Sequence, residues 1–214
     1  MLYDAILFDM DGVLIDSEAF MARTGVMALA DFGIAAKPED FAEFVGQGED
    51  RYVGCVAEKY GHPYEKAMKY RLYEYYGRMV AQEAKIPEGE REVLDTLRAR
   101  GYRLAVCSSA DREKVLHNLR ALGLGERFFD VLLTGSEVVH QKPAPDIYEQ
   151  AAERLAVPPA RCLVVEDAPS GINAARACGM DAAAILSSFP KEYLLARSSP
   201  RYLLANLREL LTIT

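Results

Sequence analysis

Short apolar runs alternate with helical patterns over most of the chain. The first run covers residues 3–8 and stops abruptly at an acidic segment. Further runs with the length of buried strands cover residues 102–107, 129–134, 162–165 and 182–186. Helical patterns between them cover residues 88–100, 111–122 and 172–178, and a glycine follows each one, as is typical after a helix end. This alternation predicts an α/β fold, a parallel sheet with helices on both faces.

Residues 17–84 break this rhythm. They contain no strand-like run and have the pattern of several amphipathic helices interrupted by glycine and proline. We therefore predict an inserted all-α domain at residues 17–84, and an α/β core assembled from residues 1–16 and 85–214.

Charge and composition exclude several classes of protein. The 25 basic and 32 acidic residues give a net charge of −7, and no basic run exceeds two residues, so a nucleic-acid partner is not expected. The apolar run at 5–8 is too short for a signal peptide or a membrane span, and the four cysteines form no CxxC pair. We expect a cytoplasmic protein that does not associate with membranes.

Polar residues follow three of the predicted strands at the point where each strand ends. Asp9 and Asp11 follow the first, Ser108 follows the second, and Glu166 and Asp167 follow the fourth. Open α/β sheets bind ligands at the carboxyl ends of their strands. The sequence therefore predicts an active site at this edge.

These residues stand in segments that resemble the haloacid dehalogenase superfamily. Residues 9–18, Asp-Met-Asp-Gly-Val-Leu-Ile-Asp-Ser-Glu, resemble its first motif, whose leading aspartate is the nucleophile. Ser108 matches the second motif, Lys142 the third, and Glu166 with Asp167 the fourth. The four motifs occur in the right order over essentially the whole chain. The resemblance implies a Rossmann-like core, and the helical insertion resembles the small cap of the branch containing sugar phosphatases, phosphoglycolate phosphatases and β-phosphoglucomutases.

The resemblance also implies a division of labour in phosphoryl transfer. Asp9 would attack phosphorus and form an aspartyl phosphate, which water then hydrolyses. Asp11 would protonate the leaving oxygen and later deprotonate that water. Lys142 would neutralise the phosphoryl group, while the Ser108 hydroxyl and the Ser109 amide would bind its oxygens.

A carboxylate nucleophile and a phosphate repel each other, so the site needs a cation. Mg²⁺ prefers oxygen ligands, and the resemblance implies a site made of Asp9, the backbone carbonyl of Asp11, and Asp167. The sequence leaves the role of Glu166 open: it is a direct metal ligand, a hydrogen-bond acceptor that supports the ligands, or a structural residue.

The expected activity is hydrolysis of a small phosphorylated metabolite, with a sugar phosphate as the leading candidate. Haloalkanoate dehalogenases lack the second aspartate, so Asp11 disfavours that activity. A β-phosphoglucomutase-type mutase carries a histidine in the helix after the first motif, where residues 20–22 here are Phe, Met and Ala, and a cap arginine where residues 48–50 are Gly, Glu and Asp. Arg51 lies two positions from the expected place. A phosphosugar mutase is kept as the alternative.

A more remote alternative is a non-catalytic phospho-acceptor signalling domain. A phosphorelay receiver also combines an acceptor aspartate, metal-binding carboxylates, a hydroxyl residue and a lysine, but it is much shorter and has no helical insertion. A catalytically inactive binding protein with the same fold has usually lost one of the four motifs, and none is missing here. A monomer is the default expectation.

Substrate selection is expected from a glycine-containing cap loop. Glycine lets a loop approach a ligand closely. The candidate specificity residues are Gly46, Gln47, Gly48, Glu49 and Arg51.

Overall fold

The computed structural model describes residues 2–44 and 48–214 and contains one six-stranded sheet. All pairings are parallel, in the order β3-β2-β1-β4-β5-β6. The strands are β1 (Ala5–Phe8), β2 (Arg103–Cys107), β3 (Val131–Leu133), β4 (Cys162–Glu166), β5 (Asp181–Ile185) and β6 (Tyr202–Leu204). The predicted parallel α/β fold is therefore confirmed, and β6 is an edge strand that the apolar pattern did not indicate.

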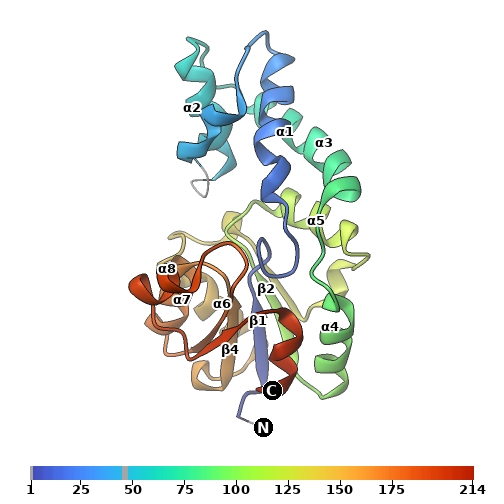
Figure 1. The fold of residues 1–214 in the computed structure, drawn as a ribbon, viewed down its shortest axis with the longest axis vertical. Helices are drawn as coiled ribbons and strands as arrows, with labels where there is room; N and C mark the ends of the chain where they lie inside the picture. Colours follow the sequence, from blue (N-terminus) through green and yellow to red (C-terminus); the bar gives the residue numbers. More distant parts are fainter. Residues whose placement is uncertain (1, 45–47) are drawn as a thin grey trace.

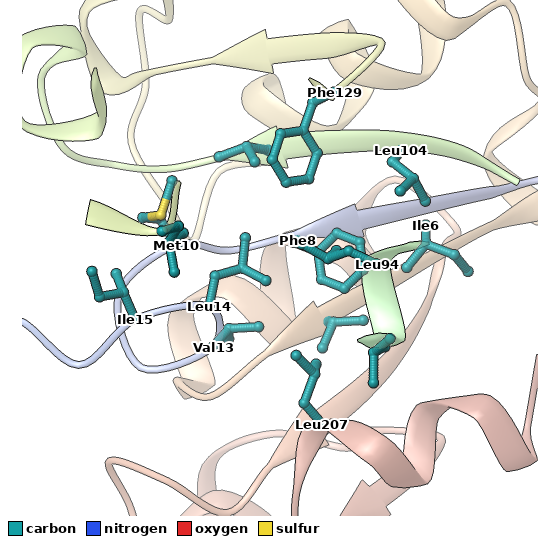
Figure 2. Close-up of a cluster of buried hydrophobic side chains, with 14 of the residues drawn as sticks. Ile6, Phe8, Met10, Val13, Leu14, Ile15, Leu94, Leu104, Phe129 and Leu207 are labelled. Carbon is teal, nitrogen blue, oxygen red and sulfur yellow. The ribbon is translucent and has the colours of Figure 1, made fainter. Parts of the chain in front are cut away.

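Helices cover both faces of the sheet. Successive side chains of a strand point to opposite faces, and the apolar side chains on each face are buried against helices. Ile6 and Phe8 of β1 join one hydrophobic cluster, together with residues of α4 and α5, and Figure 2 shows part of it. Ala5 and Leu7 join a second cluster with residues of α6, α7 and α8. These helices are α4 (Glu90–Ala99), α5 (Arg112–Ala121), α6 (Asp146–Leu155), α7 (Pro169–Ala177) and α8 (Lys191–Arg197).

Three of the core helices test the predicted patterns. Helices α4 and α5 begin and end within two residues of the predicted ranges. Helix α7 begins at Pro169 rather than at residue 172, and proline is favoured in the first turn of a helix. Short 3₁₀ segments complete the chain: η1 (Pro38–Phe44), η2 (Glu126–Phe128), η3 (Gly135–Glu137), η4 (Pro159–Arg161) and η5 (Leu207–Thr212).

The insertion is helical and has a hydrophobic cluster of its own. Its α-helices are α1 (Glu18–Ala30), α2 (Glu49–Lys59) and α3 (Lys66–Glu83). Leu29, Phe41 and Val53 are among the buried residues of this cluster. Figure 1 shows the three helices grouped beyond one end of the sheet. The two connecting segments pair with each other, since the Asp16 amide donates to the Lys85 carbonyl at 2.8 Å and the reverse bond is 3.2 Å.

Apolar helices of membrane-spanning length are absent from the described part of the chain.

Glu90, the first residue of α4, is buried with only 2% of its surface exposed. Within the described residues, its Oε1 has no hydrogen-bond partner. Burial raises the pKa of Glu90 from 4.5 to about 7, because the charged form loses its hydration. The folded state therefore binds this proton more tightly than the unfolded state does.

This pKa shift predicts a specific pH dependence of stability. A raised carboxyl pKa contributes stability below the unfolded value of 4.5, and that contribution is lost as the pH rises to about 7. Glu90→Gln removes the titration. As the pH rises from 4.5 to about 7, we therefore expect the unfolding free energy of the wild type to fall, relative to that of Glu90→Gln, by at most about 3 kcal/mol. Urea unfolding at several pH values measures the difference. The exposed Glu92→Gln change on the same helix is the control, and a pH-independent difference for Glu90→Gln would contradict the assignment.

Candidate active site

The sequence-predicted residues meet at the centre of the sheet, where the strand order reverses between β1 and β4. Asp9 directly follows β1, and Glu166 is the last residue of β4, followed by Asp167. A reversal of strand order leaves a crevice at the carboxyl ends of the two strands, which is where open α/β sheets bind ligands. The topology therefore brings these carboxylates to one point.

Lys142 lies between them and links three strands. Its ammonium nitrogen donates to Asp9 Oδ1 at 2.5 Å, to Glu166 Oε1 at 2.7 Å and to the carbonyl oxygen of Cys107, at the end of β2, at 2.9 Å. The Lys142 side chain is only 5% exposed. A buried lysine needs such partners, because an unpaired charge in the interior is strongly unfavourable.

The Glu166 carboxylate meets a donor at each of its acceptor positions. Oε1 accepts hydrogen bonds from Lys142 and from the Tyr148 hydroxyl at 2.9 Å, and Oε2 accepts from the backbone amides of Asp167 and Ala168, both at 3.1 Å. An ionised carboxylate offers about four lone-pair positions, so four protein donors saturate it. Glu166 thus anchors Lys142 and the turn that carries Asp167.

Two glycines make room for these carboxylates. A side chain at Gly171, in the first turns of α7, would overlap the Glu166 carboxylate. One at Gly12 would overlap the Asp167 carboxylate, and Gly12 also has φ of +80°, in the left-handed region that favours glycine. Ser187 donates to the Gly12 carbonyl oxygen at 2.5 Å, which joins this loop to the segment after β5.

Oxygen atoms of Asp9, Glu166 and Asp167 all lie within 4.8 Å of one another. Glu166 is already saturated by protein donors, so Asp9 and Asp167 are the side chains that fit a metal ion. Mg²⁺ is commonly held by one or two carboxylates together with water and substrate phosphate. The donor set of the site therefore suits Mg²⁺.

Burial and charge compete at Asp9 and Lys142. Burial raises the pKa of Asp9 above its usual range, against the opposing effect of the Lys142 ammonium. Burial alone would lower the pKa of Lys142, but the carboxylates of Asp9 and Glu166 outweigh it and raise that pKa. A further cation beside Asp9 favours its ionised form.

The Asp11 carboxylate lies outside the cluster of Asp9, Glu166 and Asp167 and has its own set of donors. Ser17 and Asn118 donate to its Oδ1, the latter at 3.4 Å, and Lys114 donates to its Oδ2 at 2.8 Å. Lys114 and Asn118 both belong to α5. The two aspartates of the first motif are thus held by different lysines, Asp9 by Lys142 of the loop before α6 and Asp11 by Lys114 of α5.

Ser108 follows β2 at the same edge of the sheet and is 2% exposed. Its amide donates to the Leu133 carbonyl at 3.1 Å, and its Oγ accepts the Ala110 amide at 3.2 Å. The hydroxyl hydrogen of Ser108 is therefore available to another acceptor. Ser109 is the next residue of the same loop, which leads into α5.

The cap residues divide into three groups. Gly46 and Gln47 lie outside the described residues. Gly48 precedes α2 with φ of +86°, and Arg51 is exposed. Glu49 is 8% exposed, and burial raises its pKa against the opposing charge of Lys114. The charge of Lys114, in α5 of the core, thus acts on Glu49 of the cap.

Sequence reasoning missed the residues that support the site. Tyr148 sits under Lys142 with its ring 4.9 Å from the ammonium, and Lys114 and Asn118 hold Asp11. A usable signal was present for the last two, since they lie four positions apart beside the apolar Val115 and Leu119 of the same helix. A charged residue on a buried helix face needs a partner.

Comparison with known proteins agrees with this geometry. The family described as haloacid dehalogenase-like hydrolase matches residues 3–179. The chain is 38% identical over 199 residues to Protein SUPPRESSOR OF QUENCHING 1, chloroplastic, of Arabidopsis thaliana, a match covering 89% of this chain. That match spans only 18% of the Arabidopsis protein's length.

Two further relatives match over most of their own length. The phosphorylated carbohydrates phosphatase of Thermotoga maritima is 31% identical over 179 residues, covering 83% of this chain and 82% of that protein. CbbY from Rhodobacter sphaeroides, solved in complex with phosphate, has a TM-score of 0.84 at 26% identity, covering 97% of this chain and 96% of that one.

The close approach of Gly171 to Glu166 predicts a sensitive position. Gly171→Ala would push the Glu166 carboxylate away from Lys142, so we expect the unfolding free energy to fall by about 1–3 kcal/mol although alanine favours helices. Gly125→Ala is the control, because nothing lies within 4 Å of a side chain added there. Chemical denaturation of both variants checks this, and a Gly171→Ala protein as stable as the wild type would show that Glu166 is not confined as described.

Proposed function

The chain belongs to the haloacid dehalogenase-like hydrolases, and from that membership we propose that it is a Mg²⁺-dependent phosphatase that hydrolyses a small phosphorylated metabolite through an aspartyl phosphate. Its place in the family and its phosphatase relatives make it a phosphoric monoester hydrolase. The observation that carries the proposal is the placement of Asp9 beside a buried lysine at the sheet's reversal point.

Asp9 is the proposed nucleophile. A carboxylate oxygen of Asp9 forms a bond to phosphorus while the ester bond from phosphorus to the leaving oxygen breaks. A water oxygen then attacks phosphorus, the bond to Asp9 breaks, and free phosphate leaves with the aspartate restored. Dividing a very slow hydrolysis into two displacements is the benefit of a covalent intermediate.

Asp11 is the proposed acid and base. It donates a proton to the leaving oxygen in the first displacement and takes one from the attacking water in the second. Proton transfer of this kind contributes roughly 10²–10⁴-fold to a rate. The support for this role is its position two residues after Asp9, on the loop that Gly12 and Ser187 hold in place.

Lys142, Ser108 and Ser109 are the proposed phosphate-binding groups. Lys142 already touches Asp9, so its charge lies where the phosphoryl group transfers. Two unit charges 4 Å apart interact by about 4 kcal/mol at an effective dielectric constant near 20. The Ser108 hydroxyl and the Ser109 amide would donate hydrogen bonds to the phosphoryl oxygens.

Asp9, Asp167 and the backbone carbonyl of Asp11 are the proposed ligands of Mg²⁺, and Glu166 is proposed as the anchor of Lys142 rather than a ligand. Saturation of Glu166 by four protein donors supports this division. When bound, Mg²⁺ supplies positive charge that offsets the repulsion between the nucleophile and the phosphate.

Residues 17–84 are proposed to form a cap domain that selects the substrate. Helix α3 touches the core next to the phosphate-binding loop, where Lys69 and Tyr73 bind Asp111 at 2.9 Å and 2.8 Å. A cap in this place covers the leaving group of a substrate bound at Asp9. The name of the Thermotoga maritima relative supports a sugar phosphate as the substrate class. Gly48, Glu49 and Arg51 remain the described specificity candidates.

Hydrolysis is preferred over phosphoryl transfer between sugars. The segment where a mutase would carry its histidine, residues 20–22, holds Phe, Met and Ala, and its first residue, Phe20, is 2% exposed and packs against Tyr76 with ring centroids 5.5 Å apart. A mutase must also keep its phosphoryl group from water while holding a second phosphate. None of the side chains at residues 20–22 can act as an acid or a base.

The proposal predicts release of inorganic phosphate from p-nitrophenyl phosphate and from phosphorylated metabolites, dependent on Mg²⁺ and abolished by chelation with EDTA. Asp9→Asn removes the nucleophile without changing the side chain's shape, and we expect kcat/KM to fall at least about 10³-fold. A panel of phosphorylated metabolites, compared by kcat/KM, identifies the leaving group.

Two outcomes would contradict this assignment. Retention of activity by Asp9→Asn would remove Asp9 from the mechanism. Incubation with β-glucose 1-phosphate and the 1,6-bisphosphate separates the alternatives, because glucose 6-phosphate formed with little free phosphate would establish the mutase instead.

A further inference from the structure

Two residues of α5 fix the Asp11 carboxylate. Lys114 Nζ lies 2.8 Å from Oδ2, and Asn118 Nδ2 lies 3.4 Å from Oδ1. They are four residues apart and therefore project from the same face of the helix. Ser17, the residue before α1, provides the third donor. Both oxygens of Asp11 are thus held, and the two α5 contacts come from a segment about a hundred residues away in the chain.

Lys114 is not a solvated surface lysine. Its side chain is 9% exposed, and its ammonium lies 5.7 Å from the centre of the Tyr76 ring. Burial alone would lower the pKa of Lys114, but Asp11, together with Tyr76 and Glu49, outweighs burial and raises that pKa. Glu49, at the start of α2, contributes to the same field. A buried ammonium group is stable only when it is paired with an opposite charge, which Asp11 provides here.

Asn118 has its orientation set by the insertion. Its Oδ1 accepts a hydrogen bond from the Tyr76 hydroxyl of α3 at 2.5 Å. Because that contact occupies the amide oxygen, the amide nitrogen faces Asp11. A contact between α3 and α5 therefore determines which group Asn118 offers to the carboxylate.

We propose that Lys114 and Asn118 are positioning residues that hold the Asp11 carboxylate in place for proton transfer. This inference rests on the proposed function, in which Asp11 is the acid and base. Among the described residues, the hydrogen bonds and the ion pair of Lys114 and Asn118 at the site go to Asp11, whereas Lys142 binds Asp9 and Glu166. Loss of either should therefore impair proton transfer while leaving the phosphate and nucleophile sites intact.

Lys114→Met tests this, because methionine matches the length of the stem and removes the charge. A displacement of about 1 Å can cost a hundredfold in rate, so we expect kcat to fall about 10–100-fold with KM changed less than about threefold. Beryllofluoride with Mg²⁺ mimics the phosphoryl group on Asp9, and its affinity, measured by ¹⁹F NMR titration, should stay within about threefold of the wild type. Arg120→Met, an exposed change on the same helix, is the control for both measurements.

The possible results separate the explanations. Unchanged kcat in Lys114→Met overturns the positioning role, and so does a parallel loss of kcat and beryllofluoride affinity, which would indicate a structural role. Should Lys114→Met not fold, Lys114→Gln keeps a hydrogen-bond donor and is compared with Asn118→Leu by the same two measurements. A wild-type protein that neither binds beryllofluoride nor releases phosphate would refute the proposed function itself.

Discussion

The ammonium group of Lys142 is the contact on which the site depends. It joins the ends of the three central strands by binding Asp9 after β1, the Cys107 carbonyl of β2 and Glu166 of β4. Breaking a buried ion pair typically costs about 3–5 kcal/mol, because the remaining charge has no counter-charge. Loss of the Lys142 ammonium would leave two carboxylates, those of Asp9 and Glu166, without this counter-charge. In the proposed mechanism, the same charge that stabilises the strand ends would neutralise the phosphoryl group transferred to Asp9.

Around this contact, glycines leave room for the carboxylate side chains, and hydrogen-bond donors hold those carboxylates in place. Gly12 and Gly171 allow the backbone to approach Asp167 and Glu166, where any side chain would overlap a carboxylate. The insertion adds a second, separate arrangement, since α3 packs on α5 and α5 supplies Lys114 to Asp11. The proposed nucleophile, Asp9, and the proposed acid–base group, Asp11, are thus supported by different parts of the molecule, so substitutions can perturb one without the other.

The sequence predicted the parts of the fold and site that depend on local pattern. Buried parallel strands are continuous apolar runs, and five strands were found in this way; the short apolar segment that forms the edge strand β6 was not recognised, because two of its three residues are only partly buried and a helix–strand alternation does not precede it as clearly. Asp9, Lys142 and Asp167 were identified because they follow strands or match the superfamily motifs. Lys114 was not, because a lysine in a helix is usually solvated, and its partner Asp11 is distant in the chain.

Trapping the covalent intermediate tests the central claim most directly. Wild-type enzyme is mixed with a ³²P-labelled phosphoester and Mg²⁺, quenched in acid within the first turnover and reduced with borohydride, and the modified peptide is identified by mass spectrometry. The account predicts a phosphoryl group, and after reduction a homoserine, at position 9 alone. Turnover that proceeds without any modification of Asp9, or with the label on another residue, would contradict it.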